Sequence, residues 1–171
     1  MARILPIGLF LAGAIITGCQ ETSNTATPVD STDSTKTETL KPAKLQTRLG
    51  TVNQAHTKDS ATISFTVIND ADSVLQFCKW ETPFEPRLGK FLEVTDSLGT
   101  EASFMGAMAR RVMPPPAEAY ISVPAHDSVS TLYNLAKNYS VSKGTYTVKY
   151  TGGGVSGLDS GNKVSIIVSG R

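Results

Sequence analysis

A regular alternation of small polar and large apolar residues in segment 61–68 is the feature that most constrains this fold. The segment reads Ala-Thr-Ile-Ser-Phe-Thr-Val-Ile, with an apolar residue at every second position up to Val67. Successive side chains of a β-strand point to opposite faces, so this period of two gives one face to a core and the other to solvent. Asn69-Asp70-Ala71-Asp72 follows and is typical of a turn. The segment therefore predicts a half-buried strand.

Short runs of similar character recur from Leu45 onward. Turns such as Asp96-Ser97-Leu98-Gly99 separate them, and no segment has a long apolar stripe with a helical period; Asn134–Tyr139 could form one helical turn. Short strands at this spacing predict an all-β fold, an antiparallel, immunoglobulin-like β-sandwich of about seven to nine strands. The other strands are expected at Leu45–Val52, Val74–Trp80, Phe91–Thr95, Ala102–Met105, Ala119–Val123, Ser128–Tyr133, Thr145–Tyr150 and Lys163–Val168.

Three residues of this pattern are expected to have structural roles. Gly144-Thr145-Tyr146 resembles the approach to a tyrosine corner, in which the phenol hydrogen-bonds the backbone at the entry to a late strand. Trp80 is the only tryptophan, and it ends the run 74–80, where immunoglobulin-like sandwiches often bury one. Cys78 lies in the same run, so we expect a buried thiol rather than a reactive one.

Residues 1–18 have the character of a signal peptide. Arg3 precedes the apolar run 4–16, which is too short to span a membrane. Ile16-Thr17-Gly18-Cys19 resembles the lipobox of bacterial lipoproteins, in which the cysteine is lipidated and the preceding peptide is removed. The resemblance implies a lipid anchor at Cys19. The next residue is Gln20 and not Asp, which in enterobacterial-type sorting resembles the pattern of lipoproteins that are passed on to the outer membrane. The alternative is an ordinary cleaved signal with an incidental cysteine.

The segment after Cys19 differs from the rest of the chain. Up to about Lys44 it is rich in Ser and Thr and has no aromatic residue, so it cannot bury enough apolar surface to offset the entropy of ordering. We therefore expect a signal peptide over 1–18, a lipidated cysteine with a disordered tether over 19–44, and the sandwich over 45–171. If Cys19 carries lipid, Cys78 has no partner for a disulfide bond.

Charge and motifs argue against nucleic acid and against catalysis. The chain has 16 Lys and Arg against 15 Asp and Glu, and no basic stripe. His56 and His126 are far apart in expected loops, where we expect solvent-exposed side chains, and neither belongs to a His-Glu-x-x-His motif. The run 152–157 lacks the Lys-Ser/Thr ending of a phosphate-binding loop and is expected to be a hairpin loop. We expect no catalytic residue, no metal site and no cofactor.

Two segments resemble a known family. Lys79-Trp80-Glu81-Thr82-Pro83-Phe84-Glu85 is similar to a Lys-Trp-x-Thr-Pro-x-Glu motif in the amino-terminal β-sandwich of deuterolysin-like (aspzincin, peptidyl-Lys) metalloendopeptidases. The run 106–120 resembles the second signature of that domain: a glycine, a basic pair, a proline and an acidic-x-Tyr ending. In those proteases a zinc catalytic domain follows the sandwich, whereas this chain stops at Arg171, so we do not expect proteolytic activity to carry over.

What the resemblance could carry over is a recognition surface made of two loops. Prolines fix backbone angles in both, which lowers the entropy lost on binding. The alternative is that the motifs only shape a corner of the sandwich. The candidate partner-binding residues are Thr82, Pro83, Phe84, Glu85, Arg110, Arg111, Pro114, Pro115 and Glu118.

We expect a non-catalytic lipoprotein with an immunoglobulin-like binding module. It would be anchored in the lipid bilayer of the bacterial outer membrane, facing the periplasm, and would contact an envelope protein that could be a peptidase. An inhibitor or folding assistant of a peptidase is the second hypothesis. A thiol- or metal-dependent enzyme that uses Cys78 is the third.

Overall fold

Nine strands and three single turns of 3-10 helix form the described part of the chain, which is residues 44–52 and 55–170 of a computed structural model. The signal peptide, Cys19, Gln20 and almost all of the expected tether lie outside these residues. The elements are β1 (Gln46–Thr51), β2 (His56–Thr57), β3 (Thr62–Asn69), β4 (Leu75–Cys78), β5 (Leu92–Asp96), η1 (Ala117–Ala119), β6 (Tyr120–Val123), β7 (Asp127–Asn134), η2 (Leu135–Lys137), β8 (Gly144–Tyr150), η3 (Gly154–Ser156) and β9 (Lys163–Ser169).

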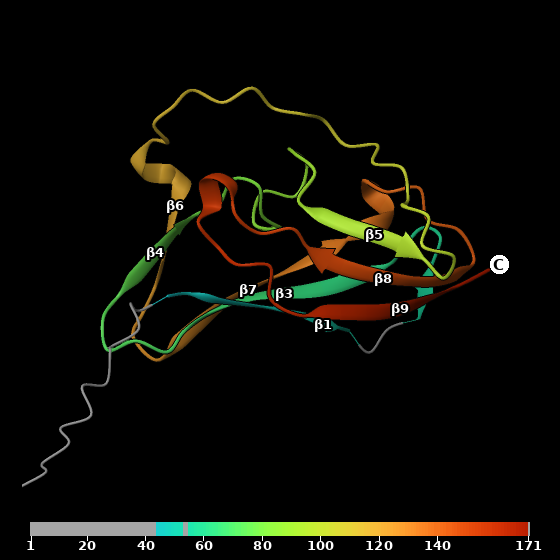
Figure 1. The fold of residues 1–171 in the computed structure, drawn as a ribbon, viewed down its shortest axis with the longest axis horizontal. Coiled ribbons are helices and arrows are strands. Elements are labelled where there is room, and N and C mark those ends of the chain that lie inside the picture. The colour runs from blue at the N-terminus through green and yellow to red at the C-terminus, as the bar shows by residue number, and fades with distance from the viewer. Residues whose placement is uncertain (1–43, 53–54, 171) are drawn as a thin grey trace, which may run out of the picture. The chain divides into compact units, whose positions relative to one another are not determined.

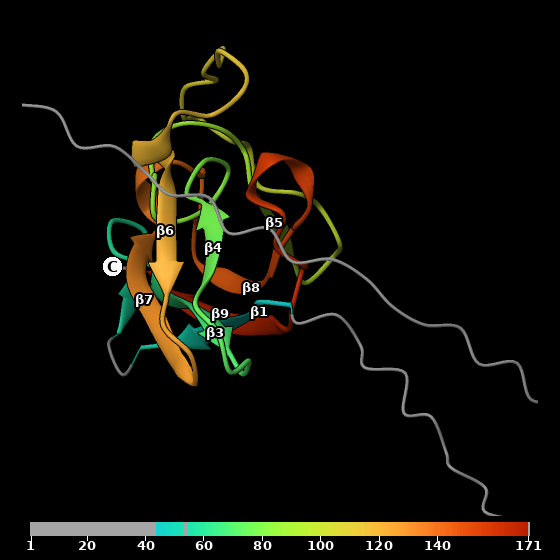
Figure 2. The ribbon, with the colours of Figure 1, turned by 90° about the vertical axis from the view of Figure 1, so that its left-hand side faces the viewer.

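Two sheets pack against each other, and a two-stranded pair completes one end of the domain (Figures 1 and 2). The first sheet has the order β1-β3-β7 and is antiparallel throughout. The second has the order β2-β9-β8-β5, in which β2 pairs parallel with β9. The order β1-β3-β7 opposite β5-β8-β9 matches strands A-B-E opposite C-F-G of an immunoglobulin sandwich. The predicted all-β sandwich is confirmed.

The core lies between the two sheets and follows the alternation of segment 61–68. Ile63, Phe65 and Val67 of β3 are fully buried. Val148 and Tyr150 of β8 face them from the second sheet, and the Phe65 and Tyr150 ring centroids lie 4.9 Å apart. Each such side chain contributes about 1.5–3 kcal/mol when it is removed from water. The predicted inward face of β3 is therefore confirmed.

Two parts of the sequence fold differently from expectation. Segment 102–105 is not a strand: it contributes only an isolated bridge between Phe104 and Tyr139, while Glu101 bridges Thr95. A strand was not expected at His56, yet His56 begins β2 and is buried, and its Nδ1 has no hydrogen-bond partner among the described residues. Pairing with β9 draws this histidine out of the solvent, which the sequence of a two-residue strand does not signal.

The loop over 152–157 and the helical turn near 134–139 agree with expectation. The loop joins the paired strands β8 and β9, and η3 is its only helical turn. Its shape depends on Gly154, whose backbone φ is +58° and whose missing side chain leaves room for the Glu81 carboxylate. Asn134 caps the start of η2, and its side chain accepts a hydrogen bond from the Ala136 N–H.

Tyr146 forms the hydrogen bond expected of a tyrosine corner. Its hydroxyl accepts a 2.9 Å hydrogen bond from the backbone N–H of Ser142 and lies 3.3 Å from the Ser142 Oγ. The bond fixes the chain where it enters β8.

Replacing Tyr146 by Phe should therefore lower the free energy of unfolding by about 1 kcal/mol, because the Ser142 N–H loses its partner. Urea unfolding of the purified protein measures the loss. Tyr120→Phe is the matched control, since the Tyr120 side chain is exposed and its hydroxyl makes no hydrogen bond among residues 44–52 and 55–170. Equal stability of the two variants would contradict the role given to Tyr146.

Three buried tyrosines make the fold sensitive to alkali. Burial raises the pKa of Tyr150 to about 12, although a hydrogen bond with Ser156 opposes the shift. Burial also raises the pKa of Tyr139 and of Tyr133 above the ordinary value of 10.0. In the unfolded chain these phenols ionise near their ordinary pKa of about 10.

The contribution of these tyrosines to the free energy of unfolding should thus be constant up to about pH 10 and should fall as the pH rises toward about 12, since in that window their phenols release protons only in the unfolded state. Urea unfolding across that range measures the fall. In Tyr150→Phe the free energy of unfolding should fall less steeply with pH, because one of the three phenols that release a proton on unfolding is missing. A fall of the same steepness in that variant would contradict the assignment of Tyr150.

Candidate functional site

Arg111 joins the two loops that the sequence singled out. It belongs to the connection between β5 and β6, and its Nη2 donates a hydrogen bond to Oε2 of Glu85 in the connection between β4 and β5. Its guanidinium also lies over the Trp80 ring, 4.6 Å from the ring centroid. Both groups of the ion pair are mostly buried, so the pair is better shielded from water than a surface salt bridge. We call this arrangement the Arg111 clamp.

Trp80 supports the clamp from a small apolar cluster outside the main core. Its partners there are Cys78 and Ala119, with Val155 packed beside them. The expected strand 74–80 was too long, since β4 ends at Cys78 and the chain turns at Glu81 with a positive φ of 57°. Trp80 is therefore buried as expected, but after its strand rather than on it. Cys78 is 1 % exposed, in agreement with a buried thiol.

Thr82, Pro83 and Phe84 face inward and do not form the expected recognition surface. Thr82 is fully buried, and its Oγ1 donates to the Lys79 carbonyl at 2.6 Å and accepts from the Phe84 N–H at 3.2 Å. Pro83 is buried beside it. The Phe84 ring packs on the main core, with ring centroids 5.4 Å from Phe77 and 6.1 Å from Phe65. The Thr-Pro-Phe sequence shapes a turn and closes one part of the core.

Most candidates in the connection between β5 and β6 remain accessible. Arg110, Pro114 and Glu118 are exposed, while Pro115 is half-buried. The Glu118 backbone carbonyl accepts a 3.0 Å hydrogen bond from Lys79 Nζ, which ties this end of the connection to the end of β4. In Figure 1 the connection runs along the length of the sandwich from β5 to η1 and β6.

The same connection exposes large apolar side chains that the sequence analysis did not select. Met108 is 75 % exposed, Val112 84 % and Met113 63 %. Contiguous exposed apolar surface marks interaction sites, so three such side chains close together in the sequence make this loop a candidate for one. The available signal was three large apolar residues around a basic pair, just before three consecutive prolines. We call the exposed side chains of Met108, Arg110, Val112, Met113, Pro114 and Glu118 the loop surface.

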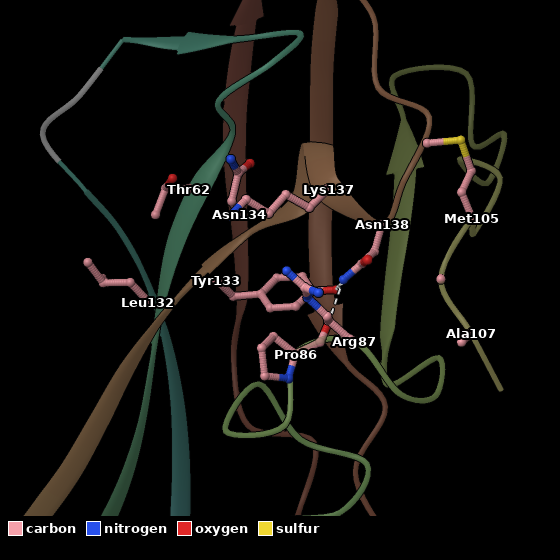
Figure 3. Close-up of a pocket in the computed structure, with 11 residues that line it drawn as sticks. Thr62, Pro86, Arg87, Met105, Ala107, Leu132, Tyr133, Asn134, Lys137 and Asn138 are labelled. Atoms are coloured by element: carbon pink, nitrogen blue, oxygen red, sulfur yellow. Dashed lines mark hydrogen bonds between the residues drawn. The ribbon is translucent and has the colours of Figure 1, made fainter. Parts of the chain in front are cut away.

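A cavity of about 760 Å³ opens at a different place, beside β7 (Figure 3). Figure 3 shows Leu132 on one side and Met105 on the other, with Pro86, Arg87 and Tyr133 between them. No part of the sequence suggested this cavity, because its walls come from four separate segments. They are Thr62, Pro86, Arg87, Met105, Gly106, Ala107, Leu132, Tyr133, Asn134, Lys137 and Asn138.

Asn138 holds the walls of the cavity together. It is buried, and its Nδ2 donates to the Pro86 carbonyl and, at 2.8 Å, to the Tyr133 hydroxyl. Its backbone carbonyl accepts a 2.7 Å hydrogen bond from the Met105 N–H. One residue thus fixes segments from both long connections against the end of β7.

Within residues 44–52 and 55–170, no group of three or more His, Cys, Asp or Glu side chains is placed to hold a metal ion. In the same residues no helix has the length and apolar character needed to cross a membrane. The histidines are separate: His56 is buried in β2, while His126 is exposed and its Nε2 lies 2.8 Å from Asp72 Oδ1.

Comparison with known proteins gives no match to this chain, either among protein-family models or among curated protein sequences. The resemblances to bacterial lipoproteins and to the deuterolysin-like sandwich stay predictions.

The Arg111 clamp yields a direct prediction. Arg111→Met keeps the aliphatic part of the side chain but removes the charge, so the loop should detach from Trp80 and the free energy of unfolding should fall by about 1 kcal/mol. Because Trp80 is the only tryptophan, its fluorescence should shift to the red and acrylamide should quench it more strongly. Arg110→Met, at the exposed neighbouring position, is the control and should leave the emission unchanged. An unchanged spectrum in both variants would refute the clamp.

Proposed function

We propose that this protein is a non-catalytic lipoprotein whose sandwich binds a protein of the bacterial cell envelope through the loop surface. The observation that carries the proposal is the exposure of Met108, Val112 and Met113 beside the exposed cation Arg110. Burial of such side chains against a partner gains about 25 cal/mol for each Å² of apolar surface removed from water. A cation among them adds selectivity for an acidic partner surface.

The loop surface is held in place before any partner arrives. The Arg111 clamp fixes the connection to Glu85 and Trp80, and Lys79 fixes it again at Glu118. Pro114 and Pro115 restrict the backbone between these points. A restrained loop loses less entropy on binding, so the same contacts give a tighter complex. Thr82, Pro83 and Phe84 serve the surface indirectly, by positioning Glu85.

The membrane anchor in this proposal rests on the sequence. Lipid on Cys19 would hold the protein on the bilayer, and Gln20 supports sorting to the outer membrane with the sandwich in the periplasm. The suggestion that the partner is a peptidase rests on the deuterolysin-like resemblance, and this protein would then act as an inhibitor or a folding assistant of that peptidase. The burial of Cys78 supports a structural role for this residue, because a buried thiol is not accessible to substrates.

Site-specific photo-crosslinking in bacteria that produce the full chain tests the proposal. A photoreactive phenylalanine analogue at Val112 should give a discrete crosslinked protein, because this position lies at the centre of the loop surface. The same analogue at Leu98 is the matched control: Leu98 is 88 % and Val112 84 % exposed, but Leu98 lies in the turn after β5. Identical crosslinks from both positions, or none from Val112, would disprove the role of the loop surface.

Two further arms of this experiment separate the parts of the proposal. In Cys19→Ala, palmitate incorporation and membrane retention should both be lost, whereas retained label would exclude an anchor at Cys19. Purified metallo- and cysteine peptidases should be inhibited by the protein if the partner is a peptidase bound at its active site. If the peptidases keep full activity while Val112 still gives its crosslink, the protein is a binding module and not an inhibitor.

A further inference from the structure

We infer that the cavity beside β7 binds an extended peptide segment that carries a carboxylate, and that this segment adds as a strand to the outer edge of β7. The site is separate from the loop surface, since Arg110, Val112 and Met113 do not line it. Its ligand class is also different, because the loop surface presents a projecting loop and the cavity presents a strand edge with a charged recess.

The position of the cavity on the strand is the first argument. Leu132 and Asn134 point to one face of β7, whereas the intervening Tyr133 points to the buried face, as their exposures show. Side chains from both faces of β7 line the same cavity, and Thr62 of β3, which pairs with Asn134, lines it too, so the cavity extends around the carboxyl-terminal end of β7. β7 is the last strand of its sheet, and among the described residues no strand pairs with its outer edge.

A free strand edge recognises extended peptides through the backbone. Its N–H and C=O groups offer the hydrogen bonds of a new antiparallel or parallel ladder, and pockets beside the edge read the side chains of the added strand. The other edges of the two sheets are less available. β5 is lined by Glu101 and Ala102, whose N–H donates 2.8 Å to the Val94 carbonyl, and β1 packs beside β9.

Charge is the second argument, and it selects the ligand. Arg87 and Lys137 both line the cavity, both are exposed, and neither forms an ion pair within residues 44–52 and 55–170. The lining contains no Asp or Glu, so the recess is positive. A carboxylate would be attracted there and could accept two hydrogen bonds from the Arg87 guanidinium. This carboxylate could belong to a chain terminus or to an acidic side chain.

The remaining walls suit an apolar side chain next to that carboxylate. Leu132 is 64 % and Met105 61 % exposed, and both line the cavity. The volume of about 760 Å³ is within the range of pockets that enclose ligands and is large enough for several side chains. Because Asn138 already ties both long connections to β7, the walls need little rearrangement on binding.

Capture of synthetic peptides by the immobilised full chain in detergent, read by mass spectrometry, tests the inference. Three pools of acetylated octapeptides, randomised over Val, Ile, Phe, Tyr, Thr and Ser, would be compared. The first ends in a free carboxylate, the second is amidated with one internal Glu, and the third is amidated with Gln in that place. At least one carboxylate pool should be enriched about tenfold or more over the neutral pool. The pool that is enriched identifies the source of the carboxylate.

Variants of the protein and the peptides separate this site from non-specific attraction. Arg87→Glu with Lys137→Glu should abolish the enrichment, whereas Lys143→Glu with Lys163→Glu changes the charge equally at exposed positions away from the cavity and should preserve it. The captured peptides would also be made in two versions, N-methylated at the odd residues or at the even residues. One of the two versions should lose binding, because N-methylation removes the N–H groups that donate hydrogen bonds to the edge of β7. Any of four results would overturn the inference. No pool is captured, or the neutral pool is captured as well as the carboxylate pools. Both double variants lose the enrichment equally, or neither N-methylated version of the peptides loses binding.

Discussion

The ring of Phe65 stands at the centre of the contacts on which the rest of this structure depends. It lies on β3, contacts Tyr150 of the opposite sheet at a centroid distance of 4.9 Å, and contacts Phe84 at 6.1 Å. The first contact joins the two sheets, and the second fixes the turn after β4. With Phe84 packed inward, Glu85 is placed to bind Arg111, and Arg111 holds the connection that carries the loop surface. The alternating sequence of β3 thus determines where the loop surface lies, because Phe65 positions Phe84, Phe84 positions Glu85, and Glu85 binds Arg111.

The connection between β5 and β6 serves both proposed sites. Near its start, Met105 is hydrogen-bonded to the Asn138 carbonyl and forms a wall of the cavity. Further along, Arg111 attaches the connection to Glu85 and Trp80, and the exposed residues beside it form the loop surface. The cavity and the loop surface therefore have separate attachment points on this connection. A change that detaches Arg111 is therefore expected to alter the loop surface while Asn138 keeps the cavity walls in place.

The sequence predicted the parts of the fold that have a local period or a local motif. Eight expected strands correspond to real ones because several alternating residues reveal each, and the Tyr146 corner has its own short signature. β2 escaped prediction because two residues have no period. Phe84 looked accessible because a proline-bounded turn gives no sign of the Thr82 hydroxyl bonds that direct the ring inward. The cavity depends on Thr62 and residues 86–87, 105–107 and 132–138 meeting in space, and no local pattern in the sequence indicates that they do.

The unequal edges of the two sheets have a consequence for self-association. Fibrous assembly through strands needs each molecule to accept a neighbour on one side and to offer a matching strand on the other. Here β5 is already lined by its own following segment, β1 lies against β9, and β2 is a strand of two residues. This leaves β7 as the long strand with a free outer edge in the two sheets of the described part of the chain. Pairing at β7 alone uses the same edge of each molecule once, so it ends in a closed complex of defined stoichiometry rather than in a growing polymer.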